Sequence, residues 1–182
     1  MDEVLSWKDE LEEKDYHAIP FINAKGYHSK TIAYSLWHIF RIEDIVVNTL
    51  IKNDEQVFFA GAYQKKINSP IITTGNELVG EQIAEFSKCL NVDALYEYIA
   101  AVKEATDEWL KSIDFSELKR RFDDTDKNRI QKLNVVSTNE QAIWLIDYWC
   151  NKDVKGLIQM PLSRHWIMHI EASIRIKNKI KG

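Results

Sequence analysis

The chain has 182 residues, of which 45% are hydrophobic, 29% are charged and 11% are aromatic, and its net charge is −4. Only six glycines and three prolines occur, too few for the many tight reversals of a β-sandwich or barrel. The apolar content argues against disorder, and the mildly acidic balance argues against a broad nucleic-acid-binding surface. We therefore expect one all-α globular domain over residues 1–182.

Targeting and redox signals point to a cytoplasmic protein. No apolar run approaches the roughly 18 residues of a membrane span, and the acidic start Met1–Glu3 lacks the positive region of a secretory signal. Cys89 and Cys150 lie far apart in no C-x-x-C pair, which is typical of ordinary thiols rather than of a disulfide framework. The expected partners thus include neither a membrane nor nucleic acid.

The first half of the chain predicts one weak and one long helix. Residues 4–14 give a weakly patterned helix, and Pro20 and Gly26 mark a connection. Ser29 is a good N-cap for a long helix that runs to about Lys52, because apolar residues then recur at helical spacing. Residues 53–75 predict a short helix followed by a loop.

Capping signals divide the middle of the chain. Thr74 and Glu77 have the spacing of a capping box, which predicts a short helix that ends near Cys89. Residues 92–113 carry an amphipathic apolar stripe and predict a third long helix. The highly charged residues 117–133 are expected to be helical or partly mobile.

The C-terminal part predicts the last long helix. Thr138 and Gln141 form a second capping box before the apolar, aromatic residues 142–149, and the last helix begins at Pro161 or Ser163. Four long helices without a convincing strand predict an antiparallel four-helix bundle with short extra helices in the connections. The cores of such bundles are where metal sites are built from side chains on facing helices.

Two histidines on the last helix face the expected core. His165 and His169 are four residues apart, so they lie about 40° apart around the helix axis and one turn along it. Arg164 and Glu171 fall on the opposite side. Two inward polar rings must be satisfied, and one divalent metal can coordinate both.

His38 repeats this inward placement on the long helix that follows Ser29. Three histidines with an open fourth position are typical of a catalytic zinc site, and the same ligand set accepts nickel, iron or cobalt. The alternative without metal requires that each inward ring has its own hydrogen-bond partner. His17 and His28 lie in or beside a predicted loop and are expected at the surface.

Other residues near His38 have two interpretations. Glu43 lies within an apolar arc of the same helix, so its carboxylate needs an Arg or Trp N–H from a neighbouring helix, or else it acts as a base or supporting group near the metal. Arg41 and Asp44 are expected on the solvated face. Four tryptophans could line a pocket or fill the core: Trp37, Trp144, Trp149 and Trp166.

Two segments carry a resemblance to a known family. Residues 35–44, S-L-W-H-I-F-R-I-E-D, look like the first histidine motif of the DinB-like (YfiT-like) metal-binding bundle proteins. Residues 163–180, with H-W-I-M-H, look like the last helix of that family. The resemblance implies that His38, His165 and His169 bind one divalent metal, usually zinc or nickel, with water completing its shell.

The resemblance also implies a range of activities. Family members are mostly transferases or isomerases that use a low-molecular-weight thiol such as bacillithiol, mycothiol or glutathione, and others are described as metal-dependent hydrolases. Many continue with His, Arg and Gly-Gln after the second ligand, where this chain has Ile170, Glu171 and Ala172, which bears on the substrate more than on the fold.

The resulting hypothesis is a metal-dependent thiol transferase or hydrolase that acts on an unidentified small molecule, as a homodimer. The alternative is a non-catalytic metal-binding or stress-related protein. A cavity of several hundred Å³ at the metal position favours the enzyme, and a site plugged by Trp or Phe favours the alternative.

Overall fold

The computed structural model describes residues 2–182, which form α-, 3₁₀- and π-helical segments joined by loops. These residues form no β-strand, and their β-type backbone pairing is limited to an isolated antiparallel bridge between Arg121 and Asp153. The all-α class expected from the sequence is thus confirmed. None of the helices in the described range is both long enough and apolar enough to cross a membrane.

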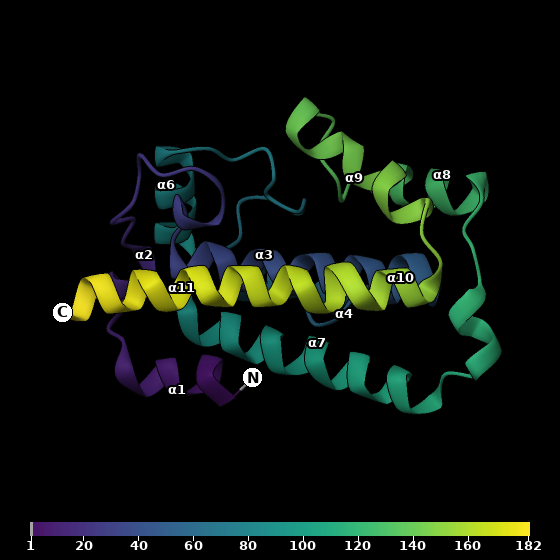
Figure 1. Ribbon diagram of the computed structural model, residues 1–182, viewed down its shortest axis with the longest axis horizontal. Helices are drawn as coiled ribbons and strands as arrows, with labels where there is room; N and C mark the ends of the chain where they lie inside the picture. The colour runs from purple at the N-terminus through teal and green to yellow at the C-terminus, as the bar shows by residue number, and fades with distance from the viewer. Residues whose placement is uncertain (1) are drawn as a thin grey trace.

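The helices follow one another in this order (Figure 1): α1 (Asp2–Glu10), α2 (Glu13–His17), η1 (Gly26–His28), α3 (Ile32–Asp44), η2 (Ile45–Ile51), α4 (Val57–Ala60), α5 (Tyr63–Ile67), α6 (Glu81–Cys89), α7 (Val92–Ser112), η3 (Phe115–Lys119), α8 (Asp124–Lys132), α9 (Glu140–Cys150), α10 (Val154–Gln159), η4 (Met160–Arg164) and α11 (His165–Lys181).

The central element is α3, which contacts both α11 and α7 (Figure 1). Its N-cap is Thr31 rather than Ser29, because the Thr31 hydroxyl accepts a hydrogen bond from the backbone N–H of Tyr34 at 3.0 Å. The same hydroxyl pairs with that of Ser87 on α6 at 2.6 Å. The helix continues through the π-helical segment η2, and every residue from Ile32 to Ile51 is buried.

Two hydrophobic clusters lie along this central helix. The first gathers around α3, α6 and α7 and includes the fully buried Trp37 and Phe40. The second gathers around η2, α8, α9 and α10 and includes Trp149. An amphipathic helix exposes its polar face to water, but this helix is buried on every side. Its polar residues must therefore find hydrogen-bond partners inside the protein.

Asp44 has such partners, and the expectation that Arg41 and Asp44 are solvated is wrong. The Asp44 carboxylate accepts hydrogen bonds from the backbone N–H groups of Val57 and Phe58, each at 2.9 Å. It also accepts one from the Tyr98 hydroxyl on α7 at 2.9 Å. The charged group is therefore fully satisfied although no water reaches it.

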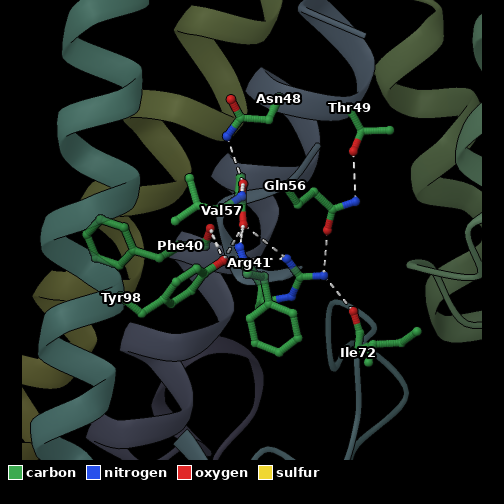
Figure 2. A network of polar contacts seen from close by, with 10 residues as sticks. Phe40, Arg41, Asn48, Thr49, Gln56, Val57, Ile72 and Tyr98 are labelled. Atoms are coloured by element: carbon green, nitrogen blue, oxygen red, sulfur yellow. Dashed lines mark hydrogen bonds and ion pairs between the residues drawn. The ribbon is translucent and has the colours of Figure 1, made fainter. Parts of the chain in front are cut away.

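Arg41 completes this network on its other side. Its guanidinium lies 3.5 Å from Asp44 and donates to the side-chain oxygen of Gln56 at 2.9 Å and to the carbonyl of Ile72 at 2.6 Å (Figure 2). The ring of Phe58 lies beneath it, with its centroid 4.1 Å away. Arg41 thus attaches the loop that contains Ile72 to the middle of α3.

The two predicted capping boxes are wrong. After Thr74 the chain stays in a loop until α6 begins beyond Gly80, and the residue that bonds Glu77 is Thr73, through its hydroxyl. The cap of α9 is Asn139, whose side chain accepts from the N–H of Gln141 at 2.9 Å. Spacing alone did not identify which of two neighbouring polar residues makes the bond.

The last long helix begins earlier than Pro161 or Ser163. Helix α10 continues through the π-helical η4 into α11. Pro161 lies within this continuous stretch. A proline removes one backbone donor and crowds the preceding turn, and the π-helical geometry of η4 accommodates both effects. His165 therefore follows helical residues and does not stand at a free helix N-terminus.

Candidate metal centre

His38 is held in one orientation by a backbone carbonyl. Its Nδ1 lies 2.5 Å from the carbonyl oxygen of Thr74. Because a carbonyl only accepts, Nδ1 carries the hydrogen, and Nε2 of the neutral ring keeps a free lone pair. The ring stacks on that of Tyr34, with 5.3 Å between centroids, so both its rotation and its tautomer are set before any ligand arrives.

The two histidines of α11 meet this nitrogen. Nε2 of His38 lies 3.2 Å from Nε2 of His165. The ring centroid of His169 is 4.9 Å from that of His38 and 4.7 Å from that of His165. One ligand atom of each residue lies within 4.8 Å of the other two. The three histidines are thus close enough to bind one metal ion.

Burial keeps all three rings uncharged at neutral pH. It lowers the pKa of His165 to about 4 and lowers those of His38 and His169 well below the ordinary value near 6.5. The neighbouring imidazoles lower the pKa of His38 and His169 further, because a second positive charge nearby is unfavourable. Neutral imidazole is the form that coordinates a metal.

Two buried ring nitrogens bear on the alternative without metal. Among residues 2–182, the buried Nδ1 atoms of both His165 and His169 have no hydrogen-bond partner. An uncompensated buried polar atom is costly, so a cluster kept only for packing should satisfy each ring. Only His38, through Thr74, meets that requirement at Nδ1. The closeness of one ligand atom from each of the three neutral imidazoles fits a divalent metal, which would coordinate all three at once.

A cavity of about 440 Å³ opens onto these histidines. Its lining comes from the loop before α3, from α3, α9 and η4, and from α11; it comprises Gly26, Tyr27, Ser29, Lys30, Tyr34, His38, Ile42, Asn76, Trp144, Leu145, Tyr148, Trp149, Met160, Pro161, His165 and His169. Trp144 and Trp149 are therefore wall residues, whereas Trp37 and Trp166 pack in the first hydrophobic cluster. The aromatic side chains of the lining leave this cavity open.

Glu43 is buried but does not line this cavity. Within the described residues it forms no ion pair, so of the two expected partners the Arg is absent and the Trp is Trp166 of α11, which lies beside it. Burial raises the pKa of its carboxyl to about 8, although Thr106 and Trp166 beside it lower that pKa in part.

The remaining candidates stay outside the histidine group. His17 and His28 are half-buried rather than solvated, and neither belongs to the cluster. Cys89 is exposed, Cys150 is buried, and both are free thiols. Sequence reasoning missed Thr74, because it acts through a backbone carbonyl that any residue carries.

Comparisons with known proteins establish the fold alone. No protein-family model and no curated sequence matches the chain. A solved structure described as the conserved protein of a locus from Enterococcus faecalis is similar, with a TM-score of 0.58 and 13% identity over 97% of this chain and 90% of that chain. At this identity the likeness extends to the arrangement of helices and to nothing chemical.

Proposed function

We propose that the chain is a metal-dependent enzyme of the DinB-like bundle type, in which His38, His165 and His169 hold one divalent ion, zinc or nickel. The observation that supports this most is the meeting of three neutral imidazoles from two distant helices at the end of an open cavity. The expected antiparallel bundle accounts for the packing of α11 on α3, and the resemblance in residues 35–44 and 163–180 agrees with the ligand set.

Each residue has a definite task in this proposal. Thr74 and Tyr34 fix the ring of His38, so that its Nε2 presents a lone pair without rearrangement. A divalent ion held by three neutral ligands keeps most of its charge and lowers the pKa of a water or thiol that it binds. The aromatic wall of the cavity excludes bulk water and positions a small molecule beside that group.

The reaction is thiol transfer to a small molecule or hydrolysis of one. An open cavity favours either over the non-catalytic alternative, because a storage or structural site gains nothing from a space of this size. Glu43 lies outside the cavity lining, so we assign it a supporting role beside Trp166 rather than proton transfer to a substrate.

The metal site is tested by composition. The full chain, purified without histidine tags or added metal salts, is expected to carry about one divalent ion per molecule in elemental analysis. His169→Ala should release that ion, whereas His28→Ala, outside the cluster, should retain it. Equal metal content in parent and His169→Ala would reject the assignment.

Turnover is tested separately with the loaded protein. Small electrophiles are offered with bacillithiol, mycothiol or glutathione, and ester and amide substrates are offered without a thiol, each with and without chelator. Activity that disappears with chelator and in His169→Ala supports the enzyme. A loaded protein that is inactive across both panels supports the metal-binding alternative.

A further inference from the structure

The cavity differs in charge from the rest of the molecule. The chain carries a net charge of −4, yet none of the lining residues in the described structure is an aspartate or glutamate. The one formally charged side chain of the lining is Lys30. Low-dielectric walls around a single sign of charge concentrate the field and attract ligands of the opposite sign.

Lys30 has no protein partner for its charge. Within residues 2–182 its ammonium forms no ion pair or hydrogen bond, whereas other half-buried lysines, such as Lys103 and Lys177, have acidic partners. The contact it does make is with the face of Tyr34, at 5.0 Å from the ring centroid. A half-buried ammonium without an anion is a costly arrangement that a bound carboxylate would relieve.

Lys30 also lies close to the three histidines. The ring of Tyr34 contacts both the Lys30 ammonium and the ring of His38. Lys30 and the three histidines line the same cavity, so a ligand that fills it can place its anionic group at Lys30 and its reacting atom at the metal position. A single ammonium matches a monoanion; a phosphate would call for further donors or an arginine fork.

Much of the remaining lining is aromatic. Trp144, Tyr148 and Trp149 of α9 contribute flat apolar faces, and Tyr27 packs edge-on against His169. Asn76 lies in the same lining with its Oδ1 buried and unpartnered in the described residues. These groups suit a flat apolar body that carries a hydrogen-bond donor.

We infer that the cavity selects small aromatic or apolar carboxylates, with Lys30 as the residue that pairs with the carboxylate and the wall of α9 as the surface that holds the body. This inference rests on the proposed function for the identity of the metal position, and it adds the substrate class and the residue that determines specificity.

Matched probes isolate the charge of the ligand. Binding of 4-hydroxyphenylacetate and of its neutral amide, 4-hydroxyphenylacetamide, is measured by titration calorimetry on the full chain, once with zinc and once after chelation. The carboxylate is expected to bind more tightly than the amide in both states. Equal affinity for the two probes, or no binding of either, would overturn the inference.

Matched variants isolate Lys30. Lys30→Met keeps the length of the side chain and removes its charge, and Lys30→Arg keeps the charge; Lys25→Met, at an exposed position of the same loop, is the control. Lys30→Met should lose about ten- to a hundredfold in affinity for the carboxylate and little for the amide, while Lys30→Arg and Lys25→Met stay within a few fold. An equal loss in Lys25→Met would refute a specific role.

Zinc content separates this inference from the proposed function. Lys30→Met should bind zinc like the parent. A protein that binds no zinc but prefers the carboxylate through Lys30 would reject the metal centre and support the anion site. A carboxylate affinity that needs zinc and is unchanged in Lys30→Met would place the anion on the metal and overturn the role of Lys30.

Discussion

Replacing Glu43 by glutamine should stabilise the metal-free protein at neutral pH. The carboxyl is buried between α3, α7 and α11 without an ion pair in the described structure, and burial raises its pKa to about 8 from an ordinary value of 4.5. The Glu43→Gln side chain has nearly the same shape and carries no charge at any pH. The free energies of unfolding of the parent and of Glu43→Gln therefore differ chiefly by the cost of burying the carboxyl group.

The size and sign of this cost follow from proton binding. Between pH 4.5 and 8 the unfolded chain has released the proton of Glu43 while the folded chain keeps it, so the folded state loses stability as pH rises. Each pH unit costs about 1.4 kcal/mol, which amounts to about 3 kcal/mol at pH 7. Below pH 4.5 both states are protonated and the cost disappears.

Urea unfolding with chelator present, at pH 4, 5.5, 7 and 8, measures this difference. Glu43→Gln should gain up to about 3 kcal/mol over the parent at pH 7, more at pH 8, and almost nothing at pH 4. Glu104→Gln, at an exposed position of α7, should stay within about 0.5 kcal/mol of the parent. A gain that does not depend on pH, or a loss at pH 8, would refute the burial of an uncompensated carboxyl.

Other consequences follow from the same structure. Asp44→Asn should lower the free energy of unfolding by about 3–5 kcal/mol in urea titrations, because it leaves the buried charge of Arg41 without its anion. The three cavity histidines have pKa values below 6.5 in the folded state. Below pH 6.5 these histidines are therefore protonated in the unfolded chain while they stay neutral in the folded chain. The metal-free protein should therefore lose up to about 1.4 kcal/mol per pH unit for each ring as pH falls towards 4, and His169→Gln should reduce that slope. Zinc at a hundredfold excess over its dissociation constant should add about 2.7 kcal/mol to the parent, seen as a higher Tm, and nothing to His169→Gln.

Helical periodicity was sufficient to predict that His165 and His169 share one face of the last helix. His165 and His169 share a face because four residues make slightly more than one turn, and that inference does not depend on where the helix begins. The start of the helix was predicted wrongly, yet the two rings still converge on His38. Angular position within a helix is thus a more robust property than a helix boundary.

The same reasoning failed where burial is complete. A helical wheel assigns charged residues to solvent, which misplaced Arg41 and Asp44, because α3 is covered on every side. Their partners come from Gln56, Ile72 and Tyr98, distant in sequence and partly from backbone atoms. No local pattern marks such partners. The predicted homodimer, cytoplasmic location and thiol cofactor stay predictions.

The buried network of Arg41 and Asp44, which the sequence did not predict, also supports the candidate site. Arg41 donates to the carbonyl of Ile72, and two residues later the carbonyl of Thr74 accepts from Nδ1 of His38. The loop that sets the tautomer of His38 is therefore attached to the same helix that carries His38, one turn further along, through a fully buried guanidinium. Asp44 neutralises that guanidinium. The backbone from Ile72 to Thr74 thus contacts both the buried ion pair and the ring of His38. This links the cost of burying two charges in α3 to the fixed orientation of the His38 ring.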